Sequence, residues 1–381
     1  MKILVVSKGN RQFGGASLVA EISHVWYNQS GLESKHFNVF HAQAKCKEKR
    51  YSILRSVAFP YYTRDFSYAL KSCDLVHFHD LKDAITPLGI KLSSRKIPSV
   101  ITHHDCYGFF RKCNYPHYIG NQELYKCDRC ECKPSMFKPH LYFSQLWKHK
   151  LLNSRRVFHI FPSEWICKLA LQSAPSWRNN HTVFPYGLDL KLFNAQQYPK
   201  PKKPTILLAA NGFSGTRKGA GFALEALRSV SDLNPKVVVV GKVGTEFREA
   251  ISNFGLDFQL LGFLNSPRDL SRIYCNANIF LCTSLADNLP LTVIETMACG
   301  TPTIGFSAGG IPEITSDRKT GLLTPIGNQK KLNDALRHAL TNPDKVKIWS
   351  SNGILRAKKL FSRELFLERH INLYQKLIDQ N

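Results

Sequence analysis

Two carboxylates, Asp287 and Glu295, stand eight residues apart in the segment 287–310, which reads DNLPLTVIETMACGTPTIGFSAGG. Pro290 lies between them, and proline suits the first turn of a helix because its missing N–H needs no partner there. We therefore expect a helix that starts near Leu289, with Glu295 on its second turn. Asp287 would then lie at the mouth of this helix, beside backbone N–H groups that have no partner within the helix.

Such a helix start suits a phosphate, because the free donors and the helix dipole attract an anion. Nearby carboxylates can accept hydrogen bonds from hydroxyl groups, and Gly300 is placed to cap the end of the same helix. Phosphate together with a polyol describes a sugar nucleotide. The alternative is an ordinary capped amphipathic helix, with Leu291, Ile294 and Met297 facing a core.

Two adjacent cations, Arg217 and Lys218, follow a predicted strand and a loop rich in Gly, Ser and Asn. At a strand end they could neutralise a diphosphate leaving group, whose charge grows as a glycosidic bond to phosphate breaks. A solvated basic loop is the alternative reading.

Two glycine pairs also follow predicted strands: Gly14 with Gly15, and Gly309 with Gly310. Without side chains, the backbone at each pair can turn tightly and approach a ligand where a helix begins. Ordinary tight turns would show the same pattern.

His103 and His104 end a further predicted strand and are followed by Asp105. A histidine there can orient sugar hydroxyls or present its backbone carbonyl near a reacting carbon, and Asp105 could fix its tautomer or bind an acceptor. From the residues alone, a structural strand-end histidine is favoured. His77 and His79 end the preceding predicted strand and could line the same cleft.

The elements that must position these residues alternate between short apolar runs and helix-compatible sequence. Buried parallel strands are predicted at 3–7, 75–78, 100–102, 157–161, 205–210, 237–240, 258–261, 279–282 and 303–306. The segment YPKPKKP at 198–204 keeps neither period and is expected to be a linker. Residues 363–380 have apolar residues at helical spacing and predict a terminal amphipathic helix. Every motif above falls just after a predicted strand, where open parallel sheets bind ligands.

Length and charge limit the class of protein further. A chain of 381 residues is expected to form two domains. No apolar run approaches the roughly 18 residues that span a bilayer, and we expect the protein to stay on the cytoplasmic side. The net charge of +24 favours an anionic partner, namely a membrane surface, a lipid-linked phosphate acceptor or nucleic acid, with a merely solubilising surface as the alternative.

Nucleic acid is disfavoured, because aromatic residues do not interleave with basic ones as stacking platforms require. The segment 45–62, KCKEKRYSILRSVAFPYY, mixes basic with apolar and aromatic residues. It fits a segment lying on anionic lipid, and equally a surface helix packed against the first domain.

Eleven cysteines in a chain with no recognisable secretory signal suggest thiols or a metal rather than a disulfide framework. Cys127 and Cys130 have metal-ligand spacing, and Cys113 with Cys132 or Cys106 could complete a tetrahedral thiolate zinc site. Such a zinc would be structural, because four thiolates leave no position for water. Free or redox-linked thiols are the alternative.

The pattern Asp287-x7-Glu295, followed by ETMACGTPTIGFSAGGIPEI and Gly321, resembles the donor-site signature of the family 4 retaining glycosyltransferases. These belong to the group 1 glycosyltransferases and have the two-domain GT-B fold. Other expected pieces occur in the right order: Gly14-Gly15-Ala16, His104-Asp105 and Arg217-Lys218-Gly219. One departure is that the first acidic position, usually Glu in the family, is Asp287 here. The Cys-rich loop is similar to that of a subset acting in polysaccharide assembly, with altered spacing.

The resemblance implies an α/β protein in which two Rossmann-like, doubly wound domains face each other across a cleft. Residues 1–197 would form the acceptor-binding domain and residues 205–360 the nucleotide-sugar-binding domain. Residues 361–381 would form a helix that packs back towards the first domain.

The activity implied is that of a retaining hexosyltransferase, which moves a sugar from a nucleoside diphosphate sugar to a hydroxyl of a lipid-linked acceptor or polysaccharide precursor. No cofactor is required in this scheme, because protein cations replace a metal and the departing diphosphate helps to deprotonate the acceptor. The catalytic residues implied are His104, Asp287, Lys218 and Arg217. Those implied to bind the nucleotide sugar are Gly14, Gly15, Asn288, Leu289, Glu295, Gly309 and Gly310.

A cytoplasmic protein, peripheral on the inner face of the membrane, would fit this activity. Two alternatives stay open. Another GT-B enzyme, such as a sugar-nucleotide epimerase, would use the same fold without an acceptor. A basic membrane- or polyanion-binding protein could retain a degenerate sugar-nucleotide site.

Overall fold

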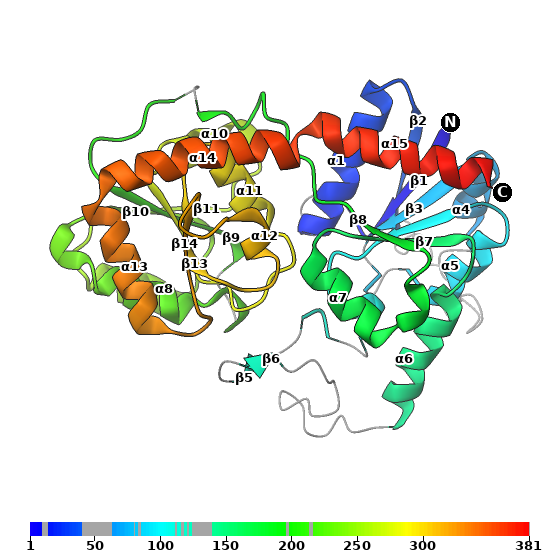
Figure 1. The fold of residues 1–381 in the computed structure, drawn as a ribbon, viewed down its shortest axis with the longest axis horizontal. Helices are drawn as coiled ribbons and strands as arrows, with labels where there is room; N and C mark the ends of the chain where they lie inside the picture. Colours follow the sequence, from blue (N-terminus) through cyan, green and yellow to red (C-terminus); the bar gives the residue numbers. More distant parts are fainter. Residues whose placement is uncertain are drawn as a thin grey trace. The chain divides into compact units, whose positions relative to one another are not determined.

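The computed structural model describes residues 1–9, 14–39, 63–79, 81–82, 85–110, 113–115, 118–119, 122–123, 139–195, 198–212 and 216–380. The chain divides into two compact units (Figure 1). Unit 1 comprises Met1–His117, Leu124–Pro185 and Phe366–Asn381, and unit 2 comprises Tyr118–Glu123 and Tyr186–Leu365. The main division therefore falls between Pro185 and Tyr186, and the last part of the chain returns to unit 1.

Unit 1 is built on a six-stranded parallel sheet of order β2-β1-β3-β4-β7-β8. Its strands are β1 (Lys2–Ser7), β2 (Glu33–Asn38), β3 (Leu75–His79), β4 (Ser99–Thr102), β7 (Val157–Phe161) and β8 (His181–Val183). Its helices are α1 (Gly15–Gln29), α4 (Arg64–Lys71), α5 (Pro87–Ser94), α6 (Pro139–Leu152), α7 (Glu164–Ser173) and most of α15 (Arg363–Asp379). Short 3-10 turns, η2 (Cys106–Gly108) and η5 (Pro175–Trp177), follow β4 and α7.

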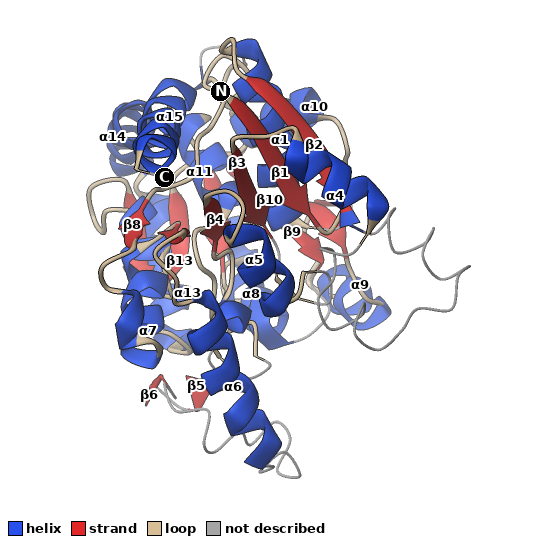
Figure 2. Ribbon diagram, turned by 90° about the vertical axis from the view of Figure 1, so that its right-hand side faces the viewer, coloured by secondary structure: helices blue, strands red, loops and turns tan. Residues whose placement is uncertain are grey.

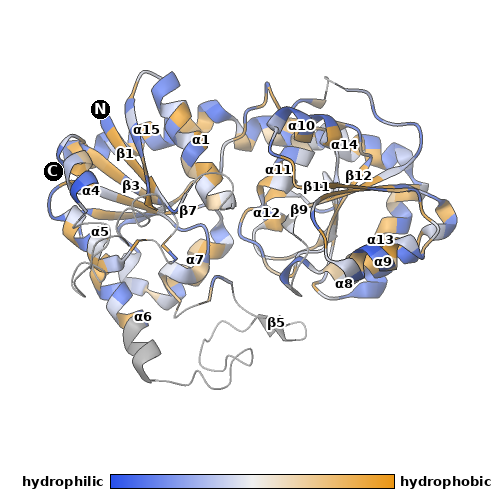
Figure 3. Ribbon diagram, turned by 180° about the vertical axis from the view of Figure 1, so that it is seen from behind, coloured by the Kyte–Doolittle hydropathy of each residue, from blue (hydrophilic) through white to orange (hydrophobic). Residues whose placement is uncertain are grey.

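Alternation along the strands of unit 1 produces a core on each face of the sheet. Leu4 and Val6 of β1 pack with residues of α4, α5 and α7, whereas Ile3 and Val5 pack with α1 and α15. Successive strand residues point to opposite faces, so a continuous apolar run supplies core residues to both faces of the sheet. Helices accordingly cover the two faces (Figure 2), and β1 and β3 are strongly hydrophobic (Figure 3).

The terminal helix α15 is part of the core of unit 1. Phe366 contacts Trp26 edge to face, with ring centroids 5.6 Å apart. The hydroxyl of Tyr374 lies 2.8 Å from that of Tyr27 and 2.6 Å from Nδ1 of His77. These contacts join the end of the chain to α1 and to the centre of the sheet.

Unit 2 has a second six-stranded parallel sheet, of order β11-β10-β9-β12-β13-β14. Its strands are β9 (Thr205–Gly212), β10 (Lys236–Lys242), β11 (Phe258–Gly262), β12 (Ile279–Cys282), β13 (Thr303–Phe306) and β14 (Gly321–Thr324). The helices are α8 (Ala220–Arg228), α9 (Thr245–Ser252), α10 (Pro267–Cys275), α11 (Leu291–Ala298), α12 (Ile311–Ile314), α13 (Gln329–Thr341) and α14 (Pro343–Phe361). Two 3-10 turns, η7 (Thr216–Lys218) and η8 (Ser231–Leu233), flank α8.

In each sheet the strand order reverses at one point. The reversal lies between β1 and β3 in unit 1 and between β9 and β12 in unit 2. Connections on either side of such a topological switch point lead to opposite faces, which opens a crevice beyond the carboxyl ends of the two strands. Arg217 and Lys218 follow β9, and Asp287 follows β12, so these residues meet at the switch point of unit 2.

A two-stranded antiparallel sheet, β5 (Tyr118–Ile119) with β6 (Gln122–Glu123), completes the described strands. Among the helices that the structure describes, none combines the length and apolar character needed to cross a bilayer.

Candidate functional site

Three charged residues converge at the switch point of unit 2. Lys218 donates a hydrogen bond from Nζ to Oδ2 of Asp287 at 2.6 Å. Nη1 of Arg217 lies 3.4 Å from the same oxygen and donates to the carbonyl oxygen of Ala286 at 3.0 Å. The cations and the carboxylate are 69 or 70 positions apart in the chain, and adjacent strands bring them together.

The electrostatics of this cluster favour an added anion. Asp287 is only 7% exposed, and its burial raises the carboxyl pKa. Lys218 and Arg217 outweigh burial and hold the pKa of Asp287 below its ordinary value, so the carboxylate is ionised at neutral pH. Two cations against one carboxylate leave a net positive charge, which could be matched by a phosphate group.

Glycine is required where the backbone closes around Asp287. Gly309 has φ +56°, and a Cβ built on it would overlap the carbonyl oxygen of Asp287. The N–H of Gly310 donates to that same oxygen at 3.1 Å. Gly219, at φ +65°, approaches the carbonyl of Thr283 equally closely. The turns after β9 and β13 therefore clamp the loop that carries Asp287.

Helix α11 begins at Leu291, two residues later than we expected from the sequence. Pro290 takes the N-cap position with φ −64° and ψ 118°, which is extended rather than helical backbone. Asn288 and Leu289 consequently lie in the preceding loop, where both are buried. Gly300 ends the helix with φ +70°, as predicted for a C-terminal glycine.

Glu295 has different surroundings from Asp287. It lies on the second turn of α11 and is 8% exposed. Burial raises the pKa of Glu295 to about 7, and the nearby Tyr274 hydroxyl of α10 acts to lower that carboxyl pKa. Sequence reasoning did not single out Tyr274, because an aromatic residue at helical spacing resembles any core position.

Gly14 and Gly15 lie at the start of α1 in unit 1. Gly14 is the N-cap residue with φ +115°, a backbone conformation that favours glycine. A Cβ on either residue would meet no atom within 4 Å, so the surrounding space is open. The structure therefore leaves room beside this turn.

His104 follows β4 and pairs with another histidine. Its Nε2 lies 2.9 Å from Nδ1 of His79, at the end of β3. Burial lowers the pKa of His104 to about 3, so the ring is neutral at physiological pH. Asp105 accepts hydrogen bonds from the backbone N–H of Tyr107 and from the side chain of Asn114. His79 contacts His104 directly, a pairing that strand-end position alone did not reveal.

His103 and His77 belong to the interior of unit 1. Nε2 of His103 lies 2.9 Å from Nδ1 of His159. His77 bonds to the Tyr374 hydroxyl and, at 2.7 Å, to Oγ1 of Thr102. Both are almost fully buried. Their contacts account for them as core residues.

Of the four cysteines expected to hold zinc, only Cys113 lies in the described part of the chain, where it is half-buried. The others, Cys127, Cys130 and Cys132, lie outside the described residues, as does the whole of segment 45–62. Within the described ranges, no group of three or more His, Cys, Asp or Glu side chains is placed to hold a metal ion.

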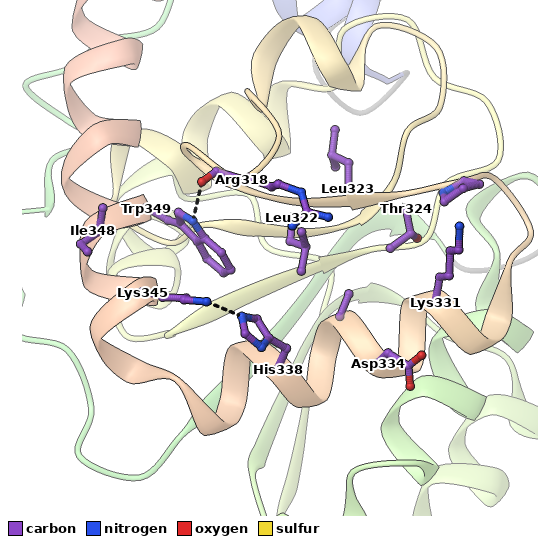
Figure 4. Close-up of a pocket in the computed structure, with 12 residues that line it drawn as sticks. Arg318, Leu322, Leu323, Thr324, Lys331, Asp334, His338, Lys345, Ile348 and Trp349 are labelled. Atoms are coloured by element: carbon purple, nitrogen blue, oxygen red, sulfur yellow. Dashed lines mark hydrogen bonds between the residues drawn. The ribbon is translucent and has the colours of Figure 1, made fainter.

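Two hollows mark the surface of unit 2. One, of about 690 Å³, adjoins the Gly309–Gly310 turn and includes Ser307 and Pro312 on either side of it. The other, of about 610 Å³, lies among β14, α13 and α14 (Figure 4). There Trp349 donates from its indole N–H to the carbonyl of Arg318 at 3.0 Å, and Lys345 lies 3.3 Å from His338. None of the predicted site residues lines either hollow.

Known proteins with related sequences or folds agree with this architecture. Residues 191–356 match the family model described as glycosyl transferases group 1. N-acetyl-alpha-D-glucosaminyl L-malate synthase of Bacillus anthracis is 26% identical over 136 residues, 35% of this chain and 35% of that protein. The matched stretches cover about a third to less than half of the length of such curated relatives.

Two solved structures share the fold over essentially the whole chain. A glycosyltransferase from Rickettsia africae superposes with a TM-score of 0.75 at 16% identity, covering 100% of this chain and 99% of that one. Alr3699/HepE of Anabaena, solved in complex with UDP, gives 0.72 at 17% identity, covering 99% and 100%. The chain thus has the GT-B fold, and its residues 191–356 are similar to the group 1 glycosyltransferases.

Proposed function

We propose that this protein transfers a glycosyl group from a nucleoside diphosphate sugar to a hydroxyl group, with retention at the anomeric carbon. The observation that carries the proposal is the convergence of Lys218 and Arg217 on Asp287 at the switch point of unit 2. A cationic pair at this point suits a diphosphate, and a buried ionised carboxylate beside it suits sugar hydroxyls.

Each group has a defined part in the proposed reaction. As the bond between the sugar and the diphosphate breaks, negative charge accumulates on the leaving diphosphate, and Lys218 with Arg217 stabilises that charge. Diphosphate binding would draw Lys218 away from Asp287, which frees the carboxylate to accept hydrogen bonds from the donor sugar. The acceptor hydroxyl loses its proton to the departing diphosphate as it attacks the same face of the sugar.

Glu295 is proposed to hold the ribose, and the Gly309–Gly310 turn to lie along the nucleotide. Asn288 and Leu289 would contribute backbone contacts in the loop before α11. In unit 1, Gly14 and Gly15 would approach the ligand, and neutral His104 would orient sugar hydroxyls. Metal is not needed in this scheme, because cationic side chains meet the leaving charge.

Related proteins support this choice of donor. The Anabaena structure contains UDP, and further structures of that protein contain UDP-glucose or UDP with glucose. The acceptor is proposed to be a lipid-linked or saccharide hydroxyl, with the Erwinia amylovora relative named an amylovoran biosynthesis glycosyltransferase as support.

The test is turnover of a panel of sugar nucleotides, read as release of nucleoside diphosphate, with and without simple hydroxyl acceptors. We expect one donor to be consumed, and Lys218→Ala to lower the rate about 100-fold or more. Lys218→Arg should recover part of the loss, because the charge remains. Lys236→Ala is the matched control, since Lys236 begins β10 at the opposite end of the same sheet.

The outcomes separate the alternatives. Conversion of the donor into an isomeric sugar nucleotide, with no diphosphate transfer product, would identify an epimerase. Absence of turnover and of any thermal stabilisation by nucleoside diphosphates would favour a binding protein with a degenerate site. The configuration of the product, read from its anomeric proton coupling, tests retention.

A further inference from the structure

Helix α6 of unit 1 exposes two large apolar side chains side by side. Trp147 is 61% exposed and Leu146 is 45% exposed. Figure 1 shows α6 extending beyond the other helices of unit 1. A tryptophan that is mostly in contact with water is uncommon and needs an explanation, because its burial against a partner would be strongly favourable.

Contacts on the opposite face of α6 keep Trp147 and Leu146 exposed. The ammonium of Lys148 donates to the carbonyl oxygens of Tyr107 and Phe110, both at 2.9 Å, and lies 4.0 Å from the centroid of the Tyr107 ring. Nε2 of His149 donates to the carbonyl of Phe109 at 2.8 Å, and Leu152 is fully buried. With these residues held inward, rotation of the helix cannot bury Trp147 and Leu146.

Two described segments beside the pair carry charge of one sign. Residues 85–104 and 139–163 contain no Asp or Glu, and besides the buried Lys148 they carry the bases Lys91, Arg95, Lys96, Lys150, Arg155 and Arg156. These segments are neighbours, because α5 packs against α6 (Figure 2) and Nη1 of Arg156 donates to the carbonyl of Arg95 at 3.2 Å. The two segments thus form a cationic surface beside an apolar pair.

We propose that this α5–α6 surface docks on an anionic lipid bilayer, with Trp147 and Leu146 entering the headgroup region. Tryptophan favours this depth because its ring is apolar while its N–H can still bond to water or lipid. Basic side chains nearby bind lipid phosphates, and the net charge of +24 attracts the protein to such a surface from a distance. The proposal does not depend on sugar transfer.

Chemistry favours lipid over other anionic partners. A single exposed tryptophan cannot provide the series of stacking platforms that nucleic acid uses. A soluble polyanion would be bound by the cations alone, which leaves the exposed apolar pair unexplained. A bilayer interface matches the cations and the apolar pair together.

Helix α14 in unit 2 provides a matched control surface. It also exposes apolar side chains, with Leu355 at 65%, and it also carries lysines. Its exposed Asp344 lies 3.3 Å from Lys347, and its tryptophan, Trp349, is buried. Leu355→Ser therefore removes exposed apolar surface from a place where we expect no lipid contact.

The test is co-sedimentation of the full chain with vesicles of phosphatidylcholine alone and of phosphatidylcholine mixed with phosphatidylglycerol. We expect binding to the anionic vesicles and not to the neutral ones. The Leu146→Ser, Trp147→Ser double variant should bind about tenfold or more weakly, because it loses the interfacial anchor. Leu355→Ser should bind like the unaltered protein.

A second variant tests the charge. Arg95→Glu combined with Arg155→Glu should weaken binding at least tenfold, since each basic residue near an anionic surface contributes about fivefold and each reversal also adds repulsion. Circular dichroism and the thermal midpoint confirm that each variant folds. The fluorescence of Trp147, isolated by comparison with Trp147→Phe, should shift to the blue and be quenched by brominated lipid.

Three results would overturn the proposal: no binding of the unaltered protein to anionic vesicles, undiminished binding of the Leu146→Ser, Trp147→Ser variant, or equally tight binding to a soluble polyanion with unchanged Trp147 emission. Donor turnover in the same variants gives a separate reading. Loss of vesicle binding with turnover intact would leave the proposed function standing, and the reverse result would leave the lipid surface standing.

Discussion

The two units share a six-stranded parallel sheet, yet the residues at their strand ends differ in electrostatic character. At the switch point of unit 2, Lys218 and Arg217 face an ionised Asp287. In unit 1, the ends of β3 and β4 carry His79 and His104, whose pKa values burial lowers far enough to keep both rings neutral. Unit 2 is thus suited to a charged ligand group, and unit 1 to an uncharged one that bears hydroxyls.

The largest expected difference between the units is in their stability at low pH, where unit 1 should be destabilised far more than unit 2. Unit 1 buries several histidines, and burial lowers the pKa of His104 and His159 to about 3 and that of His370 to about 4. The unfolded chain, with histidine pKa near 6.5, binds more protons below that pH, so this stability is lost as pH falls from about 6.5 towards 3. Near pH 4 the loss is roughly 3 kcal/mol for each such histidine.

Residues 186–365 contain a single histidine, His338, so unit 2 should keep its structure at a pH where unit 1 unfolds. Hydrogen exchange resolved by segment, from pH 7 down to pH 4, measures this directly. His370→Phe should move the transition of unit 1 to lower pH. Exchange that rises first in unit 2, or equally in the two units, would show that the buried histidines do not decide acid stability.

A glycine-to-alanine pair compares the two glycine turns. Gly309→Ala should destabilise unit 2 by roughly 1–3 kcal/mol, because φ is +56° and the new Cβ would overlap the Asp287 carbonyl. Gly15→Ala should change stability by less than about 1 kcal/mol, since Gly15 is helical and its surroundings are open. Thermal midpoints of both variants provide the comparison, and equal shifts would contradict it.

Removing the charge of Asp287 distinguishes the role of this carboxylate from that of the two cations in unit 2. Asp287→Asn should lower donor turnover about 100-fold, because the proposed sugar contact and the local carboxylate are lost. Affinity for a nucleoside diphosphate should be retained or increased, since Lys218 and Arg217 lose their internal anion. Steady-state kinetics and calorimetry measure the two quantities separately. Asp232→Asn, which alters an exposed pair with Arg337, is the control expected to change neither.

Glu295 should give the smallest effect and a specific pH dependence. Burial raises its pKa to about 7, so the ionised form that accepts ribose hydroxyls is lost as pH falls below 7. Donor affinity should therefore rise severalfold between pH 6 and pH 8. Glu295→Gln should flatten that profile in a binding titration. A profile that keeps its slope in the variant would assign the titration to another group.

Most of the fold was predictable because both sheets are parallel and buried. β7, β12 and β13 have the predicted bounds, and the other predicted strands differ by a few residues. The sequence did not predict β2, β8 and β14. Each lies at the edge of its sheet, where half-exposed strands such as ESKHFN lack the apolar run on which the prediction depended.

The candidate site was predictable as a set of motifs but not as a set of contacts. Because Arg217, Lys218 and Asp287 each follow a predicted strand, the sequence predicts that they lie on one edge of a sheet. Their ion pairs could not be predicted, because they depend on β9 and β12 being neighbours in that sheet. The predicted start of α11, near Leu289, was wrong. The helix begins at Leu291, because Pro290 adopts the extended N-cap conformation and not a helical one. The sequence pattern therefore predicted where the site residues lie in the fold, whereas tertiary packing determined which residues they contact.

Lys200 shows the limit of compositional reasoning. It lies in the proline- and lysine-rich segment that we expected to be a linker. Its ammonium donates to the carbonyl oxygens of Ala277 and Cys299 at 2.8 and 3.1 Å, and to Oγ1 of Thr301 at 2.6 Å. Burial of the ammonium lowers the pKa of Lys200 to about 8. Nothing in the local sequence distinguishes this lysine from its solvated neighbours.

The most direct test of the cationic site in unit 2 is calorimetric titration of the protein with uridine, guanosine and adenosine diphosphates. We predict saturable binding of at least one of them. That binding should weaken at least tenfold in Lys218→Ala and with rising salt, and should not change in Lys236→Ala. Absence of binding by all three, or equal affinity in Lys218→Ala, would contradict the account.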